Sequence, residues 1–302
     1  MRRKGFTLVE LLVVIAIIAL LMGILMPALS RVRQLAFRLT CGTNLSGVGK
    51  AMMIYANDYE DELPKAGGRN SAWGAVNNWT AANRTLAFGL NADGSGGKAS
   101  INSCLYLLVK YAEVTPKSFV CKGDSGTSEF NLSDVAAGNL PSTFELIDAW
   151  DFGPYTPTNN ESWKHCSYSY HMPFGSNYAL TISSEPGFAV ASERNPWLAS
   201  PAGDASNWSL FRPDITGAGG STEQAKAGNA MAHQQEGQNV MFLDTHVEFE
   251  KRAYCSVEDD NIYTVGNADG GLEWGTKPTL TSVPLSRKDS LLMHDPEKWG
   301  GR

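Results

Sequence analysis

Residues 4–16, KGFTLVELLVVIA, decide the architecture of this chain. A short basic leader ends in Gly5, and from Phe6 an almost unbroken apolar run continues to Met26. Basic residues favour the cytoplasmic side of a bilayer, and an apolar helix of about 20 residues is long enough to span it. One carboxylate, Glu10, interrupts the run. Because an acid at the centre of a membrane helix costs about 2.5–3.5 kcal/mol, we interpret Glu10 as a functional residue.

The junction between the basic leader, Gly5 and Phe6 resembles the class III signal of type IV pilins and type II secretion pseudopilins. The resemblance implies that a prepilin peptidase cleaves between Gly5 and Phe6, that Phe6 is N-methylated, and that the subunit assembles with other pilin-like subunits. In the assembled stem Glu10 would pair with the Phe6 amine, and Pro27 would mark where the helix can stretch during packing. Two alternatives remain open for these residues: Glu10 as an acid that reaches the headgroups, and Pro27 as a simple kink at the interface.

Two other kinds of N-terminal segment compete with this interpretation. An ordinary secretory signal has a basic start and an apolar core, and residues 28–30 offer it a small-x-small cleavage site. A plain signal anchor needs only an apolar run of this length. Neither alternative explains Glu10 or the adjacency of Gly5 and Phe6, so the pilin-like interpretation is preferred. It predicts a single-pass protein in contact with bacterial inner-membrane lipids, with a cytoplasmic N-terminus, a periplasmic head, and assembly into a periplasmic or surface filament.

Apolar residues become periodic after Pro27, at the spacing of an amphipathic helix. The pattern predicts one long helix that starts in the membrane and ends near Leu63, before Pro64. We divide the chain into a cleaved leader (1–5), a transmembrane stem (6–28), an amphipathic helix (29–63), a globular head (64–274) and an irregular C-terminal tail (275–302). The apolar face beyond Gly42 consists of Leu45, Val48, Met52, Tyr55 and Tyr59.

The head is predicted to be α+β, with the long helix packed against a small antiparallel sheet that carries large loop insertions. Residues 65–100 lack a period and are predicted to be a loop, while 101–111 form a short amphipathic helix and 118–121 a brief extended piece. Short strands are expected at 166–172, 188–192, 239–243 and 246–250. The last two form a hairpin around Asp244 and Thr245. We expect Val240 and Phe242 of the first strand and Val247 and Phe249 of the second to face the long helix. His233 and Asp244 are expected to fix the turn by hydrogen bonding, with ion binding as the minority interpretation.

The resemblance continues beyond the membrane segment into the part of the chain that joins the stem to the head, here called the neck. Cys41, Asn44, Leu45, Ala51, Tyr55, Ala56, Asp58 and Pro64 are placed as in a group of large, planctomycete-type pilin-like proteins related to the major pseudopilin. The segment FVCKGD, residues 119–124, takes the place of a Cys-Pro-Ser-Asp-like turn in that group. His233 and Asp244 match a C-terminal pair, although Thr245 stands where the group has Gly.

Composition excludes several classes of function. The chain of 302 residues has a net charge of −6, and loss of three positive charges with the leader makes the mature form about −9. No basic stripe remains, so nucleic acid is not an expected partner.

The GDSG segment 123–126 resembles the nucleophile loop of a trypsin-like protease, but the order of residues excludes that function. In such a protease the catalytic histidine precedes the serine in the sequence, and here every histidine follows Ser125. We therefore expect a structural subunit with no catalysis of its own.

Five cysteines lie on the side of the membrane where disulfides form, and their odd number leaves at least one unpaired within the chain. Sequence does not choose among the pairings. The absence of CxxC or CxxxC spacing argues against a thioredoxin-like site and a structural zinc, and the group His165, Cys166 and His171 fits a strand better than a metal site. The cysteines are Cys41, Cys104, Cys121, Cys166 and Cys255.

No cofactor is expected, with calcium as a minority prediction. Some pseudopilins hold calcium in a C-terminal loop, and Glu258, Asp259, Asp260 and Asp269 would supply oxygen ligands here, although a solvated acidic loop is the preferred interpretation.

The alternative function is a surface-binding module, an adhesin or carbohydrate binder on the same stem. Tryptophans in loop-like segments favour it if they are exposed, and they are Trp73, Trp79, Trp150, Trp163, Trp197 and Trp208.

Overall fold

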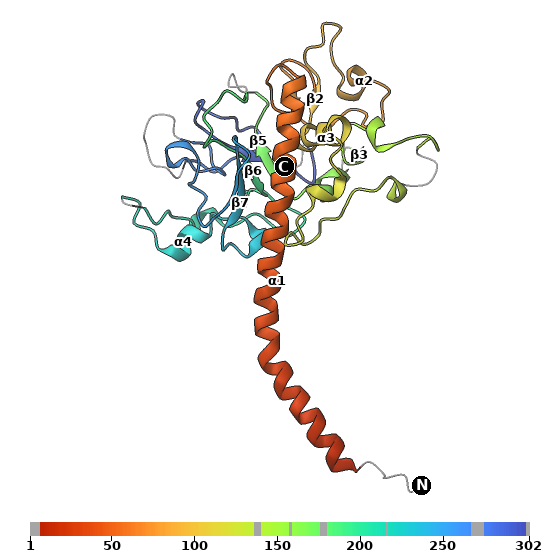
Figure 1. Ribbon diagram of the computed structural model, residues 1–302. Helices are drawn as coiled ribbons and strands as arrows, with labels where there is room; N and C mark the ends of the chain where they lie inside the picture. Colours follow the sequence, from red (N-terminus) through yellow and green to blue (C-terminus); the bar gives the residue numbers. More distant parts are fainter. Residues whose placement is uncertain are drawn as a thin grey trace.

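The long N-terminal helix α1 runs from Leu8 to Asp58 and forms both the stem and the spine of the head (Figure 1). The computed structural model describes residues 7–135, 140–156, 159–175, 180–215, 217–266 and 275–299. The helix continues through Pro27, as the sequence predicts. It ends earlier than predicted, because Glu60 and Asp61 adopt left-handed φ angles of 54° and 62° that no α-helix can include.

One five-stranded antiparallel sheet packs against the C-terminal half of α1. Its strands lie in the order β8-β7-β6-β5-β9. This arrangement confirms the predicted α+β class and the predicted 239–250 hairpin. A register shift between Ala189 and Ala191 marks an irregularity where β6 meets β7. The strands are β5 (Tyr168–His171), β6 (Ala189–Glu193), β7 (Gln238–Phe242), β8 (Val247–Glu250) and β9 (Leu292–Met293).

The amphipathic half of α1 packs on β7 and β8, as predicted. Close approach depends on Gly49, where a Cβ atom would lie 2.5 Å from the Sδ atom of Met241 and would displace that side chain. The apolar stripe is removed from solvent here, which supplies the hydrophobic stabilisation of the junction between helix and head. Its buried members are Leu45, Val48, Met52 and Tyr55, whereas Tyr59 at its end stays exposed.

The prediction of which face meets α1 is wrong for the first strand of the hairpin, β7, and is confirmed for Val247 and Phe249 of β8. Met241 and Leu243 belong to the core cluster that includes α1, whereas Val240 and Phe242 pack on the opposite face of the sheet. There they meet a second cluster that includes Trp197. Both faces of β7 are buried, so alternation alone could not tell which face belongs to the helix.

Segments predicted to be loops contain short ordered elements. Helix α3 (Ile101–Tyr111) is confirmed, but residues 65–100 hold α2 (Arg84–Phe88) and the parallel pair β1 (Ala72–Trp73) and β2 (Lys98–Ala99). The piece expected to be extended at 118–121 begins inside a 3₁₀ turn, because Pro116 occupies its first position. The remaining elements are α4 (Thr222–Lys226), β3 (Tyr155–Thr156), β4 (Asn159–Asn160) and the 3₁₀ turns Pro116–Phe119, Leu132–Asp134, Leu146–Asp148, Glu161–His165, Trp208–Leu210, Met231–His233 and Val257–Asp259.

The expectation of an irregular tail is also wrong for part of residues 275–302. Strand β9 pairs with β5 at the edge of the sheet, and the flanking His294 and Asp295 are buried. Asp295 accepts hydrogen bonds from the backbone N–H groups of Ile101 and Asn102, at 2.9 and 2.7 Å. The end of the chain therefore caps the N-terminus of α3, and it forms part of the head.

Candidate functional site

The N-terminus of α1 places Glu10 in a capping box with Thr7. The Glu10 carboxylate accepts the backbone N–H of Thr7 at 2.8 Å and its hydroxyl at 2.7 Å, while the Glu10 N–H donates to the Thr7 hydroxyl at 3.3 Å. These bonds satisfy two of the donors that a helix start leaves unpaired. The carboxylate is thereby folded back toward the site of the predicted cleavage, although Gly5 and Phe6 lie outside the described residues. Thr7 was not among the residues predicted to be functional, although the pattern Thr-x-x-Glu is typical of a capping box.

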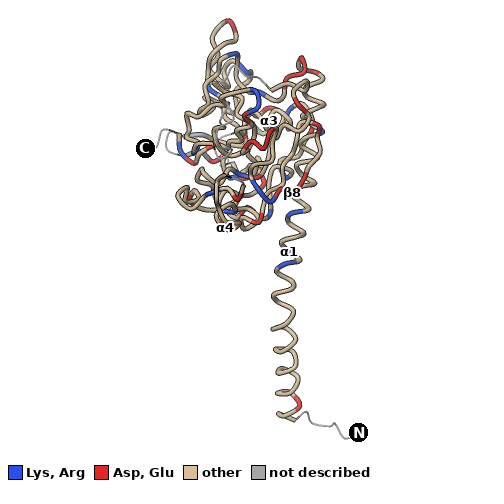
Figure 2. The backbone as a smooth tube through the Cα atoms, turned by 90° about the vertical axis from the view of Figure 1, so that its left-hand side faces the viewer, with Lys and Arg blue, Asp and Glu red and all other residues tan. Residues whose placement is uncertain are grey.

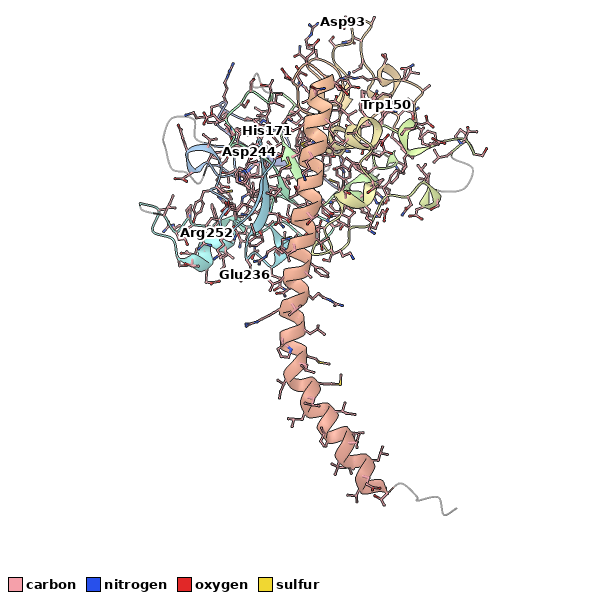
Figure 3. All side chains as sticks on the ribbon, viewed as in Figure 1. Asp93, Trp150, His171, Glu236, Asp244 and Arg252 are labelled. Atoms are coloured by element: carbon pink, nitrogen blue, oxygen red, sulfur yellow. A yellow bond between two sulfur atoms is a disulfide. The ribbon has the colours of Figure 1, made fainter. Side chains whose placement is uncertain are left out.

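Below the head, the stem is an exposed apolar rod. Its large hydrophobic side chains between Leu8 and Met26 are 46–77% exposed, and they project on all sides of the helix (Figure 3). Figure 2 shows one acidic position near the start of this rod and basic positions just below the head. Helix α1 is long and apolar enough to cross a membrane, and the window that qualifies it is not buried within the protein. Such a surface requires lipid or neighbouring apolar helices as its environment.

A disulfide joins the spine helix to the head. Cys41 on α1 and Cys121, which follows the 3₁₀ turn at Pro116–Phe119, are bonded with their Cα atoms 5.3 Å apart. Among the described residues the other three cysteines, Cys104, Cys166 and Cys255, are free thiols. Burial raises the pKa of Cys166 to about 12 and raises the pKa values of the other two, which disfavours their thiolate forms.

The predicted pair His233 and Asp244 is separated in the structure. Asp244 fixes the hairpin turn as expected: its Oδ1 accepts the backbone N–H of His246 at 3.1 Å and also contacts the His246 ring. His233 does not contribute to that turn, and its Nε2 lies 2.9 Å from Oε1 of the buried Glu193. The prediction that His233 fixes the turn is wrong, because the chain between the two residues leads His233 away from it to Cys121.

The turn after Cys121 is anchored by a buried ion pair. Asp124 accepts a hydrogen bond from Nε of Arg194 at 3.0 Å, and both residues are buried. The same guanidinium also donates to the backbone carbonyls of Trp163 and Cys166. A buried charge pair of this kind is costly to break from one side, so it holds the turn in one conformation.

The acidic segment proposed for calcium is tied to other side chains. Glu258 contacts Lys288, and Asp260 accepts both the N–H and the hydroxyl of Ser290 at 2.8 Å, while Asp269 lies outside the described residues. Nearby lies Asp289, which no sequence pattern indicated: it is a buried carboxylate whose pKa is raised to about 7 by burial and by the nearby charge of Asp260. Calcium binding at this segment stays a prediction.

Most of the tryptophans that motivated a binding module belong to the core. Trp79, Trp150, Trp163 and Trp197 are 2–8% exposed, and only Trp73 and Trp208 of the six are partly exposed. Trp150 donates its indole N–H to the carbonyl of Ala81 at 2.8 Å. Buried rings cannot stack on an external sugar, so these four provide packing.

Comparison with known proteins agrees with the geometry of the stem. Residues 1–26 match the family model of the prokaryotic N-terminal methylation motif. The chain therefore carries the class III signal of type IV pilin-like proteins, followed by a long apolar helix. No curated protein and no solved structure matches the chain.

Proposed function

We propose that this protein is a structural subunit of a type IV pilus-like or type II secretion pseudopilus filament. The observation that carries the proposal is the match of residues 1–26 to the methylation motif. From Leu8 onward these residues belong to helix α1, whose apolar side chains are exposed on every side in this segment. A membrane satisfies such a surface before assembly, and a bundle of identical stems satisfies it afterwards. Prepilin peptidase would release the Phe6 amine, which would then be methylated.

The capping box supports a specific role for Glu10 in this proposal. Its carboxylate lies beside the first residues of α1, within 2.8 Å of the Thr7 nitrogen, which is one residue from the Phe6 amine. In a stack of stems, the same carboxylate can accept the amine of a neighbouring subunit, and the low dielectric of the stem strengthens that attraction. Because both charges must also lose water, the pair selects the register between subunits more than it adds stability.

The head favours a specialised subunit. It carries several insertions on a small sheet, and the disulfide and the sheet hold it rigidly to α1. The alternative of a surface-binding module retains only Trp73 and Trp208 as partly exposed aromatic residues of the six, so the filament subunit is the better-supported function.

N-terminal mass spectrometry of the protein purified from membranes tests the proposal. The mature chain should begin at Phe6 and carry one N-methyl group, and Gly5→Val should leave the leader uncleaved because the peptidase needs a small residue there. A conservative Val9→Ile change serves as the control and should be processed normally. A mature chain that begins near Ser30 or Arg31 would identify an ordinary secretory signal and refute the proposal.

A further inference from the structure

Four side chains of metal-ligating types meet where α1 enters the head. They are Cys41, Cys121, Glu193 and His233, all buried, and their ligand atoms lie within 4.8 Å of one another. No second group of this kind occurs among the described residues. Two thiolates, one imidazole and one carboxylate are a donor set that suits Zn²⁺. In the structure the two sulfur atoms are joined to each other, which withholds both from a metal.

The distances fit a four-coordinate ion once the disulfide is reduced. Ligands at zinc distances of 2.0–2.3 Å in a tetrahedron lie about 3.3–3.8 Å apart. His233 Nε2 is 3.9 Å from Cys121 Sγ and 2.9 Å from Glu193 Oε1, so shifts of less than about 1 Å bring these donors to the required spacing. The thiolates of Cys41 and Cys121 separate when the bond between them is broken, and the 5.3 Å between their Cα atoms leaves room for this.

A second layer of hydrogen bonds holds the carboxylate in place. Asn239 donates its side-chain amide to Glu193 Oε1 at 2.7 Å and its backbone N–H to Oε2 at 2.5 Å. The same amide also donates to the carbonyl of Arg38 on α1, at 3.2 Å. Partners of this kind orient metal ligands and tune their affinity. Asn239 is therefore a positioning residue for Glu193.

The backbone is shaped to bring His233 to Cys121. At Gly123 a Cβ atom would lie 2.4 Å from the carbonyl oxygen of Ala232 and 3.3 Å from Cε1 of His233, so only glycine permits the two loops to touch. Immediately after the histidine, Gln234 and Gln235 both have φ angles of 58°, an uncommon conformation for residues other than glycine. Strain of this kind is typical of functional sites.

A cavity beside α1 reaches one member of the cluster. It has a volume of about 270 Å³, lies between α1 and the head, and has His233 and Gly123 in its wall, together with Arg38, Lys122 and Glu236. Cys41, Cys121 and Glu193 do not line it, so His233 is the member of the cluster on the cavity side. A metal site needs an entry path as well as its ligands, and this cavity extends as far as His233.

We propose that the dithiol form of this protein binds one Zn²⁺ ion through Cys41, Cys121, His233 and Glu193, and that formation of the disulfide releases it. On binding, each thiol loses its proton and the ion accepts two thiolates. On oxidation, a disulfide-bearing oxidant takes two electrons from these thiolates. Its own sulfurs take up two protons and leave as thiols, the Cys41–Cys121 bond forms, and Zn²⁺ departs. The ion would join α1 to the head in newly made chains at the point that the disulfide holds later.

Titration with Co²⁺ tests the proposal on the full-length chain in detergent, since tetrahedral Co²⁺ bound to thiolates has intense visible and near-ultraviolet bands. Protein reduced with a phosphine should bind one Co²⁺ per chain, and Zn²⁺ should displace it. The oxidised protein should show no such bands, and because it keeps the three free thiols it controls for them. Asn239→Ala should weaken binding by about 10–100-fold, and His233→Ala by at least as much. His246→Ala, at the exposed hairpin turn, should bind as the wild type does.

Equal Co²⁺ binding by the oxidised and reduced forms would overturn the proposal, as would unchanged affinity in His233→Ala. Near-ultraviolet circular dichroism decides the case in which reduction loosens the head. A signal that returns on addition of one equivalent of Zn²⁺ supports the site, and a signal that does not return refutes it. Retention of Co²⁺ by the double variant Cys41→Ser and Cys121→Ser would also refute it.

Discussion

The disulfide between α1 and the head should provide a large share of the stability of the head. Cys41 and Cys121 are 80 residues apart, and the double change Cys41→Ser and Cys121→Ser opens the loop between them. For a loop of that length the chain-entropy relation gives about 15 cal/mol/K, or about 4.5 kcal/mol at 25 °C. At about 2–4 °C per kcal/mol for a domain of this size, the melting temperature should fall by about 9–18 °C.

Thermal unfolding followed by near-ultraviolet circular dichroism measures this effect, with detergent-solubilised protein and a chelator present so that no metal replaces the bond. Reduction of the wild type should lower the melting temperature by a similar amount, because the reduced and serine forms both lack the constraint on the unfolded chain. Cys255→Ser is the matched control and should change the melting temperature by less than about 3 °C, since that thiol closes no loop. A double variant that melts within about 3 °C of the wild type would refute the reasoning.

Three further predictions concern the stem and the buried charges. Glu10→Ala should leave cleavage and membrane insertion intact while reducing co-assembly with wild-type subunits, whereas Leu12→Ala should co-assemble normally; equal incorporation of both variants would contradict the role of the carboxylate. Arg194→Met should cost about 3–5 kcal/mol of unfolding free energy in denaturant titrations, because it strands a buried carboxylate, whereas Lys164→Met, at an exposed pair, should cost at most about 1 kcal/mol. Asp289 has a pKa raised to about 7, so the folded state holds a proton that the unfolded chain has lost above about pH 4. Stability should therefore fall between about pH 4 and pH 7, by up to about 4 kcal/mol, and melting curves of Asp289→Asn should lack that part of the loss; an unchanged pH profile would contradict the assignment.

Local patterns in the chain were sufficient to predict the stem and four of the five strands of the sheet. The leader, the apolar run with Glu10 and the long helix each depend on neighbouring residues, because helical periodicity and membrane insertion act over a few turns. The same holds for the 239–250 hairpin, where a short turn joins two alternating strands. The end of α1 was misplaced by five residues, since left-handed residues such as Glu60 carry no reliable sequence signal.

Tertiary structure alone decided which faces and which distant residues meet. Both sides of β7 are apolar enough to be buried, so the alternation of residues does not say which side meets α1. In the structure Met241 packs against α1, and Val240 packs on the other side with Trp197. The short apolar stretch at β9 was hidden in a polar tail, and it became a strand only because β5 offered it an edge.

The sequence did not show that the four residues of the neck cluster meet, for the same reason. They lie at positions 41, 121, 193 and 233, so no motif of fixed spacing could reveal the group. Sequence patterns predict structure that depends on residues close together in the chain. The pairing of Cys41 with Cys121 and the approach of His233 to Glu193 depend on how the whole chain closes around α1, which only the burial of its apolar surfaces determines.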